Sequence, residues 1–110
     1  MAELLVDGRA VAPLEVAATR RARGVGLLGR DALEGALWLP RTRSVHTIGM
    51  RFAIDVAACD RAGRIVAVAT LAPGRLLLPR RHVRTVVEAP AGALVAWGAT
   101  IGSILAVGRG

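Results

Sequence analysis

The sequence predicts a mostly β fold: a single antiparallel β-sandwich or partly open barrel with one or two short helices. Short apolar runs rich in Val, Ile and Leu recur along the chain, at spacings of about ten residues that are typical of all-β domains. Turn residues separate these runs. The stretches between the runs are too short for the crossover helices of a parallel α/β fold. A chain of 110 residues has the size of one domain, which we place at residues 1–110.

The N-terminal part predicts a hairpin followed by a short helix. Residues 4–6 and 9–16 are apolar runs joined by Asp7-Gly8, a dipeptide that supplies the positive φ angles of a two-residue primed turn. Thr19 can cap a helix that extends to Leu28 and ends at Gly29. This helix is weak, because two interior glycines each cost up to about 1 kcal/mol against alanine.

The central part predicts a strand and a second hairpin. Residues 36–39 form a short apolar run that ends at a proline. Residues 52–59 and 64–71 are β-rich runs joined by Asp-Arg-Ala-Gly, in which a type I turn can close with Gly63 in the left-handed position. These two runs therefore predict an antiparallel pair.

The C-terminal part predicts three more short runs and one helix. Residues 76–78, 85–89 and 103–107 are apolar and strand-like, and residues 91–97 fit one or two helical turns stopped by a glycine. The predicted core is built from small aliphatic side chains, since the chain contains one Phe, two Trp and no Tyr.

One strand-like stretch, residues 45–56, carries polar side chains that need partners. We predict that Asp55 is a structural carboxylate held by an ion pair with Arg51 or by nearby backbone amides. His46 and Thr47, where the stretch begins, are expected to be exposed and to line a pocket. With Met50 on the same face as His46, the predicted ligand-binding residues are His46, Thr47, Met50, Arg51 and Asp55.

The net charge of +7 comes from fifteen arginines against eight acids and favours anionic partners. The near absence of stacking aromatics argues against specific nucleic-acid binding, so we expect only weak, salt-sensitive association. Arg20 and Arg21 oppose the dipole of the predicted helix and are candidates for binding an anion, with solvated surface as the alternative.

Cysteine and histidine usage predicts no metal site and no cofactor. Cys59 is the only cysteine, so no disulfide can form within the chain, and we expect it to pack in the core. His46 and His82 lack the spacing of a helical metal site. The sequence begins without the features of a signal peptide and contains no membrane-spanning run, which predicts a cytoplasmic protein.

Residues 23–30, 45–56, 60–64 and 88–92, with Gly98 and Gly102, form a specific linear pattern. This pattern resembles the bacterial Domain of Unknown Function 192 family over nearly the whole chain. The resemblance implies a small β-sandwich with one or two short helices and says little about chemistry. The chain departs from the family pattern at Ala53, where a proline is common, and at Ala58, where a larger apolar residue is common.

No nucleophile elbow, metal cluster or phosphate loop is present in the sequence. We therefore expect a non-catalytic binding or assembly module for a small anionic or sugar-like ligand or an acidic protein segment. The alternative is a small enzyme that uses Asp55 or His46 as general acid or base.

Overall fold

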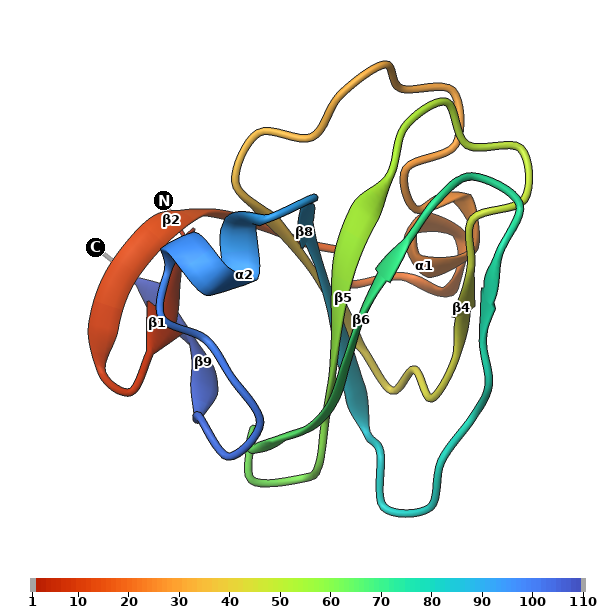
Figure 1. Cartoon of the computed structure of the whole chain (residues 1–110). Helices are drawn as coiled ribbons and strands as arrows, with labels where there is room; N and C mark the ends of the chain where they lie inside the picture. The colour runs from red at the N-terminus through yellow and green to blue at the C-terminus, as the bar shows by residue number, and fades with distance from the viewer. Residues whose placement is uncertain (1, 110) are drawn as a thin grey trace.

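The computed structural model describes residues 2–109, which form nine strands and two short helices (Figure 1). The strands are β1 (Ala2–Val6), β2 (Arg9–Val16), β3 (Ala36–Pro40), β4 (Val45–His46), β5 (Ile54–Cys59), β6 (Ile65–Leu71), β7 (Leu76–Leu77), β8 (Thr85–Pro90) and β9 (Leu105–Arg109). The helices are α1 (Arg20–Val25) and α2 (Ala93–Ala96). The predicted mostly β fold with short helices is confirmed.

Seven strands form one large sheet in the order β6-β5-β8-β3-β2-β1-β9, and β4 pairs with β7 in a separate ribbon. All pairs are antiparallel except β2 and β3, which run parallel. The two ends of the large sheet approach each other at one bridge, between Arg64 and Ile104. The sheet thus curls without closing into a barrel.

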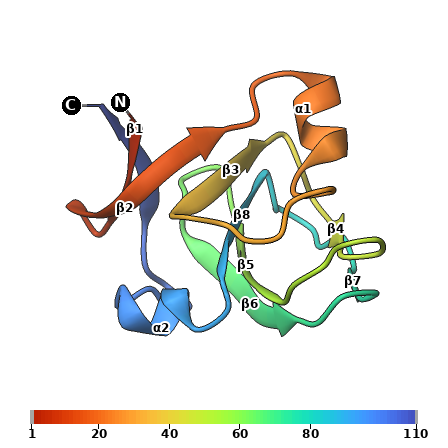
Figure 2. The same ribbon diagram turned by 90° about the horizontal axis from the view of Figure 1, so that it is seen from above.

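Two apolar cores lie on the two faces of the sheet, and β5 contributes to both because every one of its residues is buried. Ile54, Val56 and Ala58 pack in the first core, together with residues that follow α1. Ala57 and Cys59 pack in the second core, beneath α2 and beside β1 and β9. Figure 2 shows α1 and α2 at different sides of the sheet. Successive side chains of β5 thus point to opposite faces of the sheet, so this strand joins the two cores.

Local turn chemistry explains both predicted hairpins, which the structure confirms. Asp7 and Gly8 have φ of 48° and 85° and join β1 to β2. Gly63 has φ of 84° and donates its N–H to the Asp60 carbonyl at 3.0 Å, which closes the turn between β5 and β6. Both turns need backbone conformations that side chains disfavour.

The N-terminal helix is shorter than predicted. Thr19 caps it as expected, since its hydroxyl accepts a hydrogen bond from the Ala22 N–H at 3.0 Å. The helix ends at Gly26, where φ is 51° and ψ is −122°, rather than at Gly29. Gly26 adopts this irregular conformation readily, and with Gly24 in the last turn too little helix propensity remains to extend α1.

The polar stretch of residues 45–56 is not one strand, and this expectation was wrong. β4 ends at His46 and β5 begins at Ile54, with a turn between them in which Gly49 has φ of 84°. The turn separates His46 and Thr47 from Asp55, so side-chain alternation along one strand does not relate them.

No helix within residues 2–109 is both long enough and apolar enough to span a bilayer.

Candidate functional site

Asp55 is a structural anchor that ties β5 to α2. Its side chain is buried, with 4% exposed. The Thr70 hydroxyl donates to Oδ1 at 2.7 Å, while the N–H groups of Gly92 and Leu94 donate to Oδ2 at 3.0 and 3.2 Å. Gly92, the N-cap residue of α2, has no side chain that could cap the helix. The Asp55 carboxylate on β5 therefore serves as the N-terminal cap of α2.

The predicted ion pair between Arg51 and Asp55 is wrong. Arg51 lies in the turn before β5 and instead donates to the Asp31 carboxylate at 2.8 Å. Both side chains of this pair are mostly exposed, so the pair contributes little to stability. The prediction that backbone amides hold Asp55 is confirmed.

Thr47 is buried rather than exposed, which corrects a second expectation. Its exposed fraction is 0%. Its hydroxyl donates to the Ala72 carbonyl at 2.6 Å and accepts from the Arg75 N–H at 2.8 Å. Thr47 therefore fastens the segment after β4 to the segment before β7, and its hydroxyl is already partnered.

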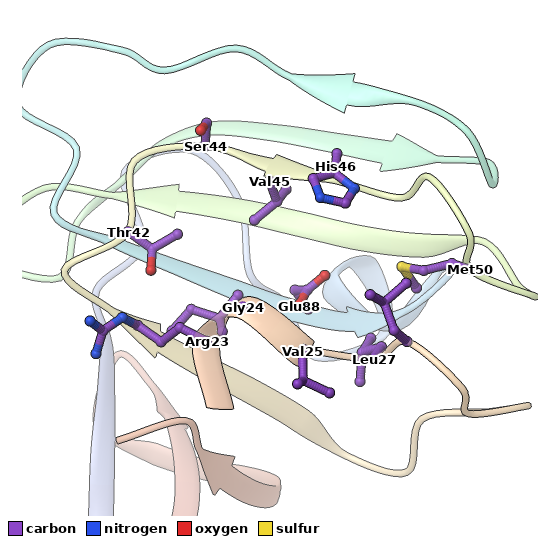
Figure 3. A pocket seen from close by; sticks show the side chains of 13 residues that line it. Arg23, Gly24, Val25, Leu27, Thr42, Ser44, Val45, His46, Met50 and Glu88 are labelled. Atoms are coloured by element: carbon purple, nitrogen blue, oxygen red, sulfur yellow. The ribbon is translucent and has the colours of Figure 1, made fainter. Parts of the chain in front are cut away.

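His46 and Met50 line a pocket of about 210 Å³ between the end of α1 and β4 (Figure 3). His46 is exposed and stands at the side formed by β4. Met50 is buried, with 8% exposed, and it forms an apolar wall with Leu27 and Leu39. The remaining lining residues are Arg23, Gly24, Val25, Gly26, Leu28, Thr42, Ser44, Val45 and Glu88.

Glu88 is the most unusual side chain of this pocket. It lies on β8, inside the large sheet, where it pairs with Leu37 on one side and Val56 on the other. Only 4% of the residue is exposed, and neither of the two ion pairs among residues 2–109 includes it. Burial raises the pKa of the Glu88 carboxyl from 4.5 to about 7, against a smaller lowering effect of the Arg30 charge.

Two glycines leave the Glu88 carboxyl open toward the pocket. A Cβ built on Gly26 would lie 3.8 Å from Glu88 Oε1, and one built on Gly24 would meet no atom within 4 Å. The last turn of α1 therefore passes over the carboxyl without a side chain covering it. Figure 3 shows Glu88 between this turn and β4.

Arg23 brings a positive charge to the same pocket. Its Nη1 is a buried nitrogen without a hydrogen-bond partner within residues 2–109. In Figure 3 the guanidinium lies at one end of the pocket and Met50 at the other, with Glu88 between them. A buried donor without a partner is rare in proteins and needs a physical explanation, such as a bound molecule.

Arg20 and Arg21 lie in the first turn of α1, and both are exposed. Arg21 lines a neighbouring hollow that also contains the Glu15–Arg30 pair. This pair has two hydrogen bonds, at 3.1 and 2.7 Å, and it lowers the pKa of Glu15. The anion site proposed at Arg20 and Arg21 stays a prediction.

The buried thiol of Cys59 packs in the second core as predicted, and burial raises its pKa to about 12. His, Cys, Asp and Glu side chains do not gather in threes around a possible metal position anywhere in residues 2–109. The polar groups that line the pocket are the Glu88 carboxyl, the Arg23 guanidinium, the His46 imidazole and the hydroxyls of Thr42 and Ser44.

Sequence reasoning found His46 and Met50 but missed Glu88 and Arg23. A signal for Glu88 was present, since a carboxylate in the apolar run Thr-Val-Val-Glu-Ala needs a partner for the same reason as Asp55. Arg23 had no comparable signal, because it lies in a run of arginines that is typical of a solvated surface.

Two solved structures share this fold. A protein of unknown function from Novosphingobium aromaticivorans DSM 12444 is 20% identical, with a TM-score of 0.82 over 94% of this chain and 83% of that one. A protein of Sinorhizobium meliloti 1021, described as a "putative transcription regulator", is also 20% identical, with a TM-score of 0.79 over 97% of this chain and 94% of that one. At this identity the likeness concerns the fold alone. Comparison with curated proteins gave no match.

The family model DUF192, described as "Uncharacterized ACR, COG1430", matches residues 2–107. This match covers both cores, the Asp55 anchor and the pocket around Glu88. The chain therefore belongs to the Domain of Unknown Function 192 family.

Proposed function

We propose that the protein is a binding domain for a small, neutral, hydroxyl-rich ligand such as a monosaccharide or polyol. The observation that carries the proposal is the Glu88 carboxyl and the unpartnered Arg23 Nη1 lining one pocket. A buried polar group without a partner, such as Arg23 Nη1, costs about 1–3 kcal/mol. A ligand that accepts a hydrogen bond from this nitrogen recovers much of this cost, and the mostly buried Glu88 carboxyl offers the ligand an acceptor.

The charges in the pocket favour hydroxyl groups over anions. One hydroxyl of a ligand can donate to the Glu88 carboxylate and another can accept from the Arg23 guanidinium, whereas an anion would be repelled by the ionised carboxylate. The same repulsion disfavours an acidic protein segment at this site. Met50, Leu27 and Leu39 supply an apolar wall for the carbon skeleton.

The pocket size also limits the ligand. About 210 Å³ is below the roughly 300–1,000 Å³ of pockets for drug-sized molecules. A single sugar ring or a short polyol is therefore the largest ligand that we expect the site to enclose.

Calorimetric titration of the protein with monosaccharides, polyols and small anions tests this function. The parent should bind a neutral ligand, more strongly above pH 7, where Glu88 is a charged acceptor. Glu88→Gln and Arg23→Met should each weaken binding about tenfold or more, since each removes a charge-assisted hydrogen bond.

Arg21→Met is the matched control, because Arg21 lies on the same helix but does not line this pocket. It should leave the affinity unchanged. Binding of anions alone, or equal affinity of the parent, Glu88→Gln and Arg23→Met, would contradict the proposal.

A second candidate function is general acid–base catalysis in the same pocket. A pKa of about 7 suits a carboxyl that transfers protons at neutral pH, and His46 lines the same space. Asp55 is poorly placed for this role, because both its oxygens accept hydrogen bonds from the protein. Turnover of a bound ligand that is lost in Glu88→Gln while binding persists would favour catalysis.

A further inference from the structure

Two loops at the β4–β7 end of the molecule carry exposed arginines (Figure 1). Arg41 and Arg43 lie in the loop of residues 41–44, and Arg80, Arg81 and Arg84 lie in the loop of residues 78–84; all five are exposed. The two loops are joined by hydrogen bonds from the Arg43 guanidinium to the Arg80 carbonyl at 3.4 Å and from the Thr42 N–H to the Arg84 carbonyl at 3.1 Å. We call these two loops the basic surface.

Within residues 2–109, no Asp or Glu side chain forms an ion pair with the basic surface. The segments of residues 35–54 and 61–87 contain nine arginines and no acidic residue. The two ion pairs found in residues 2–109 use Arg30 and Arg51, neither of which belongs to this surface. Asp60, beside the second segment, accepts hydrogen bonds from backbone N–H groups of its own turn.

Large apolar side chains stand beside these arginines. Leu76 on β7 and Leu78 just after it are 57% and 67% exposed, and they lie between Arg75 and Arg80 in the chain. β7 pairs only with the two residues of β4, and no described element covers the outer side of this ribbon (Figures 1 and 2). Exposed leucines flanked by arginines are typical of surfaces that dip into a bilayer interface.

We propose that the basic surface, with Leu76 and Leu78, docks the domain on an anionic lipid bilayer. The arginines would contact lipid phosphates while the two leucines enter the boundary between headgroups and acyl chains. A nucleic acid is the less suitable partner, because it would use the arginines and leave the leucines in water. The two loops also contain no Phe, Tyr or Trp side chain on which a base could stack.

Co-sedimentation with lipid vesicles tests this docking. The protein should bind vesicles made of equal amounts of phosphatidylglycerol and phosphatidylcholine, but not vesicles of phosphatidylcholine alone, and about 0.5 M salt should release most of it. Arg80→Gln/Arg81→Gln should lower the partition coefficient about 30-fold at low salt. Leu76→Ser/Leu78→Ser should lower it about tenfold.

Matched controls lie at the opposite end of the molecule. Arg9→Gln/Arg109→Gln removes the same charge from the β2 and β9 side, and Val95→Ser removes an exposed apolar side chain from α2. Both controls should bind the anionic vesicles nearly as the parent does. Equal weakening by Arg9→Gln/Arg109→Gln and Arg80→Gln/Arg81→Gln would overturn the proposal, because net charge alone would then explain binding.

Two further results would also overturn it. One is unchanged vesicle binding by Leu76→Ser/Leu78→Ser, which would exclude insertion. The other is tighter binding of a DNA duplex than of anionic vesicles, with an affinity that the leucine replacements do not change, which would assign the surface to nucleic acid.

Discussion

Replacing Glu88 by Gln should stabilise the protein, and the gain should grow with pH. The folded carboxyl has a pKa of about 7 against an ordinary value of 4.5. Below pH 4.5 the carboxyl is protonated in both the folded and unfolded states. Between the two values the unfolded state releases its proton while the folded state keeps it, so the parent loses stability until the pH passes 7.

The size of this loss follows from the two pKa values. Each pH unit over which only the folded carboxyl is protonated changes the free energy of unfolding by about 1.4 kcal/mol. From 4.5 to about 7 the parent should therefore lose about 3 kcal/mol relative to Glu88→Gln. The side-chain amide of Glu88→Gln is uncharged at every pH, so the variant does not lose stability through ionisation at this position.

Urea unfolding of both proteins between pH 4 and pH 8, followed by tryptophan fluorescence, measures the difference. The chain has two tryptophans, Trp38 on β3 and Trp97 after α2, and both pack against the second core. The difference between the variant and the parent should rise with pH and level off above about 7. Glu15→Gln is a control with the opposite effect on stability. Because Arg30 lowers the pKa of Glu15, this replacement should decrease the free energy of unfolding instead of increasing it. Parallel stability curves for Glu88→Gln and the parent would show that folding does not raise the pKa of Glu88.

Three other predictions concern the scaffold. Asp55→Ala should lower the free energy of unfolding by about 2–4 kcal/mol, because it removes the acceptor for two backbone N–H groups at α2; a loss below 0.5 kcal/mol in urea would contradict the anchor role. Gly63→Val should cost at least about 2 kcal/mol, since its Cβ would lie 2.3 Å from the Leu105 carbonyl oxygen at a φ of +84°; a melting temperature equal to that of the parent would be unexpected. The Cys59 thiol, whose pKa is raised to about 12, should resist alkylation at pH 8 in the folded protein and react on denaturation. Fast labelling of the native protein would show that this core opens.

Local signals made most of the strands predictable. The β5–β6 hairpin follows from two apolar runs around a turn that needs Gly63, and both conditions are visible within about twenty residues. The parallel pairing of β2 with β3 has no such signal, because α1 and a long loop separate the two strands. Tertiary packing decides that pairing.

The candidate site shows the same limit. A buried carboxylate at Asp55 could be inferred from its apolar neighbours, but its partners could not, since Gly92 and Leu94 are distant in the chain. The predicted partner Arg51 failed because a turn, not a continuous strand, connects Thr47 to Asp55. Glu88 and His46 line one pocket because β8 lies beneath α1 and β4 in the folded chain (Figure 3). No sequence pattern predicts that arrangement.

Amide NMR during titration with monosaccharides and polyols at pH 8 shows directly whether the Glu88 pocket binds a small hydroxyl-rich ligand. We expect chemical-shift changes concentrated at Gly24, Gly26, Val45 and His46, which line the pocket, and the loss of these changes in Arg23→Met. Shift changes confined to other surfaces, or none with any neutral ligand while anions produce them, would contradict the proposed function.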